Sequence, residues 1–300
     1  MDLEKAIEQH LVDGGPVPGN RKRFFCFRGF MKSGTNWIAS LLNLHPDISC
    51  IGELHLHSIY ETIQKDLRSL PIMQDSYVRR VIRGNLQGML RQTLIDLAHP
   101  NASVIGERSP VTMHPLVLKD APQIVVLRDG RDVLVSRFFH LYNYPESSRV
   151  FERFPELQPQ LAAFKNDPWY FQQHPEKLLV TETMVRESMR WWCDSIQSNR
   201  RTMATHTNLQ VLQLRYEDVH ADADKARRQM YEFLQVDPTI AESIPPELTA
   251  GLPTEQPDKF NRKGQVGDWK NYVNQQTKDW INQEAGEELI RQGYIDSLDW

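Results

Sequence analysis

A short apolar strand, a glycine-bounded loop and an amphipathic helix follow one another near the N-terminus, and this succession constrains the fold most strongly. The apolar run Phe24–Phe27 lies between basic residues and Gly29, which predicts a buried strand. Apolar residues recur at helical spacing over Gly34–Leu44, and Pro46 ends the predicted helix. A strand, a tight loop and a helix in this order begin an α/β unit.

Further along the chain, helical patterns alternate with apolar strand patterns. The predicted helices cover Ser76–Leu97, Asp132–His140, Thr183–Asn199, Asp222–Leu234 and Gln275–Arg291. The predicted strands cover Val104–Ile105, Ile124–Leu127 and Leu209–Leu214. A proline-rich loop is expected over Ile240–Asp258. Because continuous apolar strands suit a sheet that is covered on both faces, the sequence predicts an α/β fold with a central, mainly parallel sheet flanked by helices.

The region 141–179 departs from this pattern because it mixes prolines with aromatic residues. Either it forms an irregular, aromatic-lined insertion over a pocket, or it is an ordinary surface excursion. We therefore expect one domain over residues 1–300, with a core over about residues 21–272. The insertion, which we expect to cover the substrate, then spans residues 141–180, and a C-terminal helix lies within residues 273–300.

Composition narrows the class of protein. The 300-residue chain carries a net charge of −4, which gives no support for a nucleic-acid or anionic-membrane surface, although a locally basic pocket is compatible with it. The cysteines Cys26, Cys50 and Cys193 are far apart and fit neither a disulfide framework nor a zinc knuckle. The charged stretch Met1–Leu11 lacks the apolar core of a signal peptide, and no run approaches a membrane span. We therefore expect a cytoplasmic protein with reduced thiols.

The loop Gly29–Trp37 has the composition of a phosphate-binding site. It precedes a helix, whose unpaired N–H groups and positive dipole attract an anion. Lys32 adds a positive charge, while Ser33 and Thr35 add hydroxyl groups. A Walker A loop requires lysine directly after its second glycine, whereas Thr35 follows Gly34 here, so this loop is of another kind. The alternative is a helix cap with a solvated lysine.

Two further segments present cations that can bind phosphate. Arg128 ends the clearest strand with its guanidinium fork, and Ser136 adds a hydroxyl two turns into the next helix. The alternative is a salt-bridge cluster within Arg128–Asp132. Near the C-terminus, Arg262–Gly264 places two cations before a flexible glycine and can form an anion clamp. The alternative there is a surface turn with a buried Trp269.

Together these segments resemble the motifs of sulfotransferases that use 3'-phosphoadenosine-5'-phosphosulfate (PAPS). The first matches the PKSGTTW phosphosulfate loop at Lys32, Ser33, Gly34, Thr35 and Trp37. Asn36 replaces the common threonine of that loop. Arg128–Ser136 is similar to the 3'-phosphate motif RDPRDVxVS, with Gly130 where proline is usual. Arg262–Asn271 is similar to RKGxxGDWKN, and Tyr216–Asp218 is similar to a YED segment.

The resemblance covers residues 24–272, and the motifs follow in the order of the family. It implies a P-loop-like, three-layer α/β fold, PAPS as the sulfonate donor and PAP (3',5'-ADP) as the product, with no metal. It implies that Tyr216 lies near the adenine. It also implies a donor-binding set of Lys32, Ser33, Gly34, Thr35, Asn36, Trp37, Arg128, Ser136, Tyr216, Arg262, Lys263 and Gly264.

The motifs do not identify the general base, because the cytosolic branch of this family has a catalytic histidine where this chain has Arg108. Arginine cannot act as a base at neutral pH. The segment Gly106–Pro110 is instead similar to the GEKSP-like stretch of carbohydrate sulfotransferases, which often use a glutamate base, as several bacterial relatives do. Their KExHFF motif is replaced here by Gly52–His57. Glu53 is therefore the first candidate, unless it only forms a salt bridge with a neighbour such as Lys32. The further candidates, in order, are Glu107 and then His55, His57 and His140.

Other functions remain as alternatives. A small-molecule kinase would need the Walker A lysine that Thr35 replaces. A catalytically inactive nucleotide-binding or scaffold protein is compatible with the missing histidine. The pair His55 and His57 lacks an identifiable third ligand, so we expect no metal. The acceptor, a hydroxyl or amine of a small molecule or a sugar, and the oligomeric state are not determined by the sequence.

Overall fold

A five-stranded sheet organises the part of the chain that the computed structural model describes. This part comprises residues 22–114, 117–118, 121–147, 149–240, 243–249 and 254–300. The charged stretch Met1–Leu11 lies outside the described residues. So do residues 241–242 and 250–253 of the expected proline-rich loop.

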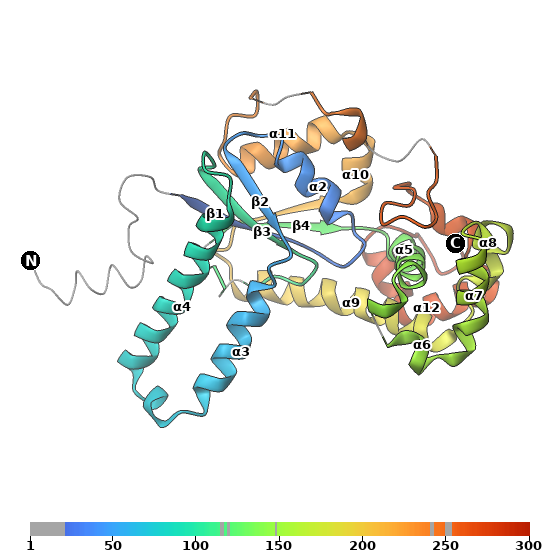
Figure 1. Cartoon of the computed structure of the whole chain (residues 1–300), viewed down its shortest axis with the longest axis horizontal. Coiled ribbons are helices and arrows are strands. Elements are labelled where there is room, and N and C mark those ends of the chain that lie inside the picture. Colours follow the sequence, from blue (N-terminus) through green and yellow to red (C-terminus); the bar gives the residue numbers. More distant parts are fainter. Residues whose placement is uncertain (1–21, 115–116, 119–120, 148, 241–242, 250–253) are drawn as a thin grey trace, which may run out of the picture.

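The sheet is parallel throughout, and its strand order is β2-β3-β1-β4-β5. Its strands are β1 (Arg23–Gly29), β2 (Ile48–Gly52), β3 (Val104–Ser109), β4 (Gln123–Leu127) and β5 (Val211–Arg215). Figure 1 shows this sheet at the centre of the molecule. The prediction of a central parallel sheet is confirmed. The strand β2 had not been predicted, and β3 continues to Ser109 beyond the predicted Val104–Ile105.

The helices lie between and beyond the strands. They are α2 (Thr35–Leu42), α3 (Leu56–Arg68), α4 (Ser76–Leu97), α5 (Gly130–Asn143), α6 (Val150–Arg153), α7 (Gln158–Asn166), α8 (Tyr170–Gln173), α9 (Glu182–Thr205), α10 (Tyr216–Ala221), α11 (Ala223–Phe233) and α12 (Gln275–Arg291). Short 3-10 turns are η1 (Pro71–Gln74), η2 (Pro145–Ser147), η3 (Pro155–Leu157), η4 (Pro175–Lys177), η5 (Pro246–Leu248) and η6 (Asp268–Asn271). The predicted bounds of α4 and α12 are confirmed, whereas α3 and α10 had not been predicted.

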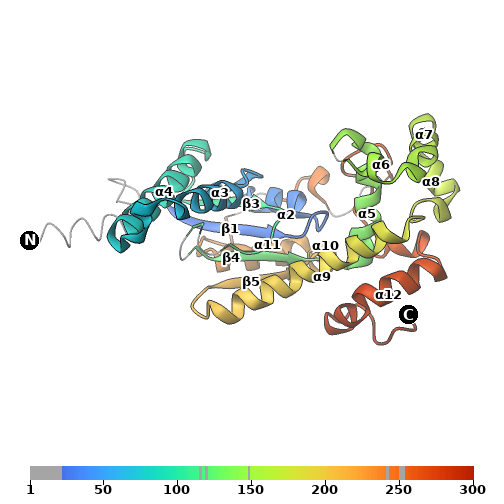
Figure 2. The same ribbon diagram turned by 90° about the horizontal axis from the view of Figure 1, so that it is seen from below.

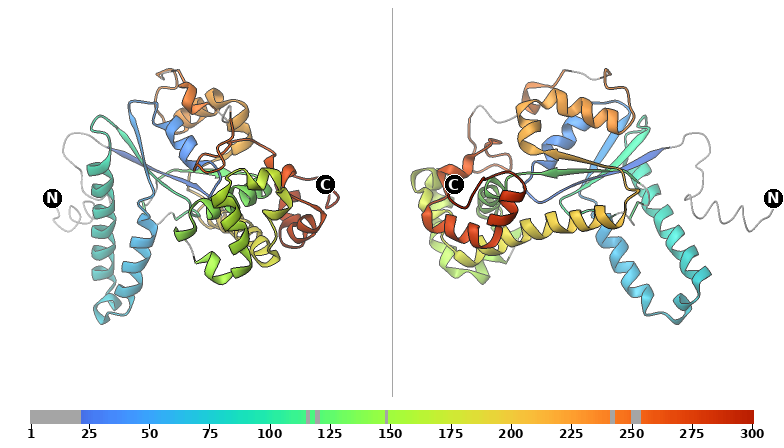
Figure 3. Two further views of the ribbon diagram at one scale, coloured as in Figure 1. Left: turned by 45° about the vertical axis from the view of Figure 1, so that its right-hand side comes forward. Right: turned by 180° about the vertical axis from the view of Figure 1, so that it is seen from behind.

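Helices cover both faces of the sheet, which gives the expected three layers (Figure 2). Successive residues of a strand point to opposite faces. In β1, Phe25 and Phe27 belong to the buried cluster that includes α2, α10 and α11. Cys26 between them belongs to the cluster that includes α3 and α4. The helices α3 and α4 then extend away from the sheet as a hairpin (Figure 3).

The region 141–180 forms short helices and 3-10 turns, so the expected irregular backbone is wrong, whereas the expected covering of the substrate stays a prediction. Pro155, Pro159 and Pro175 lie in the first turns of helices, where the N–H that proline lacks would be unpaired anyway.

Most of the aromatic residues of this region pack into a core with α5, although Phe154 also lines a pocket. The ring of Phe171 lies 5.7 Å from Phe139, 4.6 Å from Tyr142 and 5.4 Å from Phe164, measured between centroids. This helical unit joins α5, α9 and α12 beyond the carboxyl end of β4 (Figure 1).

Candidate active site

The loop between β1 and α2 has the geometry of an anion-binding loop. Gly34, the N-cap of α2, has a φ of 84° and provides no side chain to cap the helix, so the first N–H groups remain open to an anion. A Cβ at Gly34 would also lie 2.5 Å from the ring of Tyr216, so glycine is required there. Ser33 Oγ is buried, yet it makes no hydrogen bond with any described residue. A buried hydroxyl without a partner is suited to a ligand oxygen.

Lys32 lies among other cations. Burial, together with the nearby Arg128 and Arg262, lowers the pKa of its ammonium group to about 8, while Glu53 acts in the opposite direction. Its Nζ lies 4.1 Å from the centroid of the Phe260 ring. An anion in this loop would therefore relieve repulsion among the three cations and favour the charged lysine.

Arg128 connects three parts of the site. From the end of β4 it donates Nη1 to the carbonyl of Lys32 at 3.0 Å and Nη2 to the carbonyl of Gln265 at 3.1 Å. Its guanidinium carbon lies 4.2 Å from the centroid of the Tyr216 ring. The Nε atom is buried and has no acceptor among the described residues. Arg128 is thus held by backbone carbonyls, and a donor group remains for a ligand.

The residues that follow Arg128 anchor the C-terminal segment. Asp129 caps α5 and binds Arg131, whose guanidinium stacks at 3.9 Å on the Trp269 ring. Asp132 accepts hydrogen bonds from the N–H groups of Gly267 and Trp269 at 2.8 and 3.0 Å. The salt-bridge interpretation of this stretch therefore holds for Asp129 and Arg131, but it does not include Arg128.

The clamp Arg262–Gly264 lies next to the loop, but its cations already have partners. Arg262 pairs with Glu255 and with Asp268, and Lys263 Nζ lies 2.7 Å from Asp268 Oδ1. Gly264 has a φ of 66°, and its carbonyl accepts a hydrogen bond from the hydroxyl of Tyr216 at 3.0 Å. The structure therefore brings the clamp to the site through Gly264 and Tyr216.

The remaining residues of the expected donor site lie on α2 and α5. Trp37 Nε1 donates to the carbonyl of Leu248 at 2.7 Å, and the Trp37 ring meets Tyr216 edge-on at 5.6 Å. These two rings form an aromatic wall beside the loop. Thr35 is buried at the start of α2, Asn36 is half-buried beside it, and Ser136 is half-buried on α5.

Glu53 is paired with Arg108, not with Lys32. It follows β2, and its N–H donates to the carbonyl of Arg108 at 2.7 Å. Its Oε1 accepts from Arg108 Nη1 at 2.8 Å, and its side chain remains 44% exposed. The negative charge of Glu53 acts to raise the pKa of Lys32 and of His140, so the three side chains lie near one another. Arg108, which stands where the cytosolic branch has its catalytic histidine, thus orients the carboxylate of Glu53.

Glu107 has a different environment. Its carboxylate is fully buried in the sheet, where Oε2 lies 2.5 Å from Arg28 Nη1 and Oε1 accepts from the hydroxyl of Ser109. Both oxygens are therefore engaged by neighbours within the sheet. This geometry favours Glu53 over Glu107 as the base.

The histidine candidates fall into two groups. His57 stacks on His114 at 5.1 Å and lies 5.8 Å from His55, measured between ring centroids. His57 lies within α3 and His55 precedes it, so the pair is not on an extended segment. Within the described ranges, no group of three or more metal-ligating side chains is arranged to hold an ion. His140 lies on α5, where burial and then Lys32 and Arg137 lower its pKa to about 4.

The sequence patterns did not indicate several residues of this site. Phe260 over Lys32 and Arg137 beside the loop belong to segments without a recognisable pattern for these contacts. His114 became a neighbour of His57 only through the packing of the chain.

A family model described as the sulfotransferase domain matches residues 27–291. The crystal structure of mouse sulfotransferase SULT7A1 complexed with PAP is similar at 16% identity and a TM-score of 0.45, covering 92% of this chain and 86% of that chain. Sulfotransferase STF9 from Mycobacterium avium is 13% identical with a TM-score of 0.42, covering 98% and 81%. A sulfotransferase from Alicyclobacillus acidocaldarius is 18% identical with a TM-score of 0.38, covering 77% and 89%.

No curated protein matches the chain. Among the helices of the described residues, none combines the length and the apolar character that crossing a membrane requires.

Proposed function

The chain belongs to the sulfotransferase domain family, whose reaction moves a sulfonate group from PAPS to an acceptor and releases PAP, and we propose that Lys32, Arg128 and Glu53 carry this reaction. The observation that carries the proposal is the convergence of unsatisfied donors on one loop. Ser33 Oγ and Arg128 Nε are buried without acceptors among the described residues, next to a lysine surrounded by cations. Such a site is suited to a ligand with several anionic groups.

The donor would lie along the loop and the end of β4. Its 5'-phosphosulfate would bind the N–H groups at the start of α2, with Lys32 and Ser33 beside it. Its 3'-phosphate would bind Arg128, and Ser136 on α5 would add a hydroxyl. The adenine would lie by the aromatic wall of Trp37 and Tyr216. Gly264, held by Tyr216, would close the site.

The chemistry is an in-line transfer. An oxygen or nitrogen of the acceptor forms a bond to the sulfur, while the bond between sulfur and the oxygen of the 5'-phosphate breaks. Negative charge grows on that leaving phosphate, where Lys32 and the loop N–H groups stabilise it. The acceptor loses its proton to a base, for which Glu53 has the best geometry. Its exposed carboxylate is oriented by Arg108 and lies in the neighbourhood of Lys32.

The donor site can be tested by thermal stability. A ligand at about 100 times its dissociation constant adds roughly 2.7 kcal/mol to the free energy of unfolding. We expect this stabilisation with 3',5'-ADP, and less with 2',5'-ADP or with ATP and magnesium. The substitution Arg128→Ala should remove it, whereas Arg201→Ala, at an exposed position near the end of α9, should not. A shift only with ATP and magnesium would instead support a kinase.

The alternative of a catalytically inactive nucleotide-binding protein predicts the same stabilisation by 3',5'-ADP. The two differ in turnover, because only an enzyme releases PAP from PAPS in the presence of an acceptor. PAP binding without any release of PAP across hydroxyl and amine acceptors would favour the inactive protein.

A further inference from the structure

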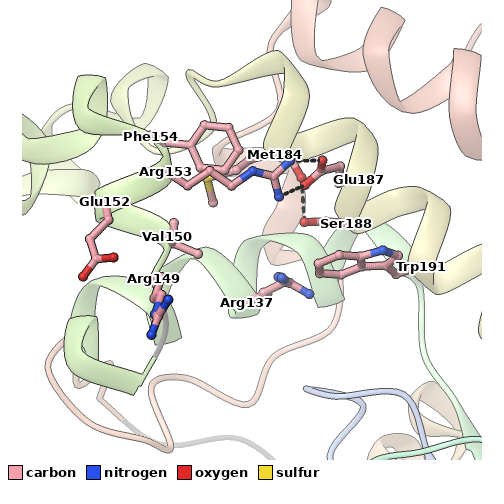
Figure 4. Close-up of a pocket in the computed structure, with 10 residues that line it drawn as sticks. All are labelled: Arg137, Arg149, Val150, Glu152, Arg153, Phe154, Met184, Glu187, Ser188 and Trp191. Atoms are coloured by element: carbon pink, nitrogen blue, oxygen red, sulfur yellow. Dashed lines mark hydrogen bonds and ion pairs between the residues drawn. The ribbon is translucent and has the colours of Figure 1, made fainter.

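A cavity of about 530 Å³ lies between α5, α6 and α9 (Figure 4). Its apolar surface comes from Phe154, Met184 and Trp191. Its remaining lining is strongly charged, with three arginines and two glutamates. A cavity that combines aromatic surface with fixed charges is suited to an organic ion rather than to a purely apolar ligand.

The charges in this cavity do not cancel. Arg153 binds Glu187 through both carboxylate oxygens, at 3.0 and 2.5 Å. Glu187 is therefore engaged, as Figure 4 shows. Arg137 and Arg149 form no ion pair with any described residue, and Glu152 is the only other carboxylate of the described lining. The cavity thus presents a positive excess.

Arg137 is the more buried of the two arginines without an ion pair. Its guanidinium carbon lies 4.5 Å from the centroid of the Trp191 ring, and its Nη1 lies 3.2 Å from the sulfur of Met31. Its Nε is buried and has no acceptor among the described residues. Burial lowers its pKa, and Glu187, which is already bound by Arg153, offsets this only in part. A carboxylate would supply the missing acceptors through the planar fork that arginine presents.

The cavity adjoins the reaction centre. Met31, which contacts Arg137, directly precedes Lys32 in the loop. His140 follows Arg137 by about one turn of α5, and its ring is influenced by both Lys32 and Arg137. A ligand bound to Arg137 therefore lies next to the position where the sulfonate is transferred.

We propose that this cavity binds the acceptor, and that the acceptor is an organic anion whose carboxylate pairs with Arg137 while its apolar or aromatic body rests on Trp191. This rests on the proposed sulfotransferase function and names the substrate class of that site. The sulfonate donor and the acceptor are then both anionic, so they repel each other. Arg137, between the cavity and the loop, offsets this repulsion and selects anionic acceptors over neutral ones.

The test compares matched acceptors in the PAP-loaded protein. The probes are 4-hydroxyphenylacetate and 6-hydroxyhexanoate, each against its uncharged amide, with affinities measured by calorimetry. We expect the carboxylates to bind about 10- to 100-fold more tightly than the amides. Arg137→Leu should abolish this preference, Arg149→Ala should reduce it, and the exposed Arg201→Ala should leave it unchanged.

The outcomes are separable. Stabilisation of Arg137→Leu by PAP shows that this variant is folded with an intact donor site. Equal affinity for carboxylates and amides, no binding of either carboxylate, or a preference that survives in Arg137→Leu would overturn the proposal. Repeating the titrations without PAP tests the cavity alone. A protein that PAP fails to stabilise but that still prefers carboxylates through Arg137 would contradict the sulfotransferase function while supporting the anion site.

Discussion

Lys32 and Arg128 differ from Arg262 and Lys263 in what balances their charge, although all four lie around one site. The first two form no ion pair with any described residue, and Lys32 is destabilised by the cations near it. The other two share Asp268 and Glu255 as partners. The loop region therefore has an unmet need for an anion, whereas the clamp region is electrostatically complete without one.

The presence or absence of a carboxylate partner determines whether a cation contributes to ligand binding or to folding stability. Cations without carboxylate partners destabilise the protein until a ligand arrives, so their contribution appears mainly as affinity and rate. Cations with buried partners contribute to the stability of the segment that carries them. We therefore expect variants of the two regions to separate into those that alter activity and those that alter stability.

The largest effect should come from Glu53, whose carboxylate lies near Lys32 but is paired with Arg108. Glu53→Gln should lower turnover by about 10²- to 10⁴-fold, because a general base contributes that much. PAP should bind at least as well, since a negative charge near the loop is removed. PAP release from PAPS and calorimetry with PAP measure the two effects, with the exposed Glu232→Gln as the control. Normal turnover would exclude Glu53 as the base.

The next effect concerns the leaving phosphate. Lys32→Ala should lower turnover by about 10²- to 10³-fold, because a group that stabilises charge only in the transition state is removed. Its half-buried position among cations means that the free energy of unfolding should not fall. Single-turnover release of PAP and a denaturant titration give both values. A destabilised variant with normal turnover would place Lys32 with the clamp rather than the loop.

The clamp should respond in the opposite way. Asp268→Asn should lower the free energy of unfolding by roughly 2–3 kcal/mol, because Arg262 and Lys263 lose a buried partner and Glu255 remains. The affinity for PAP should change less than in Arg128→Ala. Denaturant titration compares the variant with the exposed Asp296→Asn. If the variant is fully stable, the carboxylates do not anchor the clamp.

The smallest effect is a dependence on pH. In the free protein, burial, together with the nearby Arg128 and Arg262, lowers the pKa of Lys32 to about 8, so the lysine is charged below that pH and neutral above it. A bound anion favours the charged form, so the affinity for PAP should fall as pH rises through 8, by less than about tenfold per unit. Lys32→Arg should flatten this dependence because arginine stays charged. Titrations at pH 7 and 9.5 measure the change, and equal affinities would contradict it.

The sequence alone predicted the features that depend on neighbouring residues. The strand, loop and helix from Phe24 onward, and the bounds of α4 and α12, follow from local periodicity and agree with the structure. The charge and turn residues of the loop also predict a phosphate site of a kind other than Walker A. The helical form of region 141–180 was missed, because the mixture of prolines and aromatic residues was taken to indicate an irregular segment, whereas Pro155 and Pro159 begin short helices.

Tertiary structure decided which charges meet. The register of β2 against β3 pairs Gly52 with Arg108, so Glu53 meets Arg108 rather than Lys32. The positions of Arg28 and Glu107 on neighbouring strands bury them as a pair. The cavity around Arg137 exists only because α5, α6 and α9 pack together. Local sequence determines the form of each element, but the environment of a charge depends on residues brought close by strand register and helix packing.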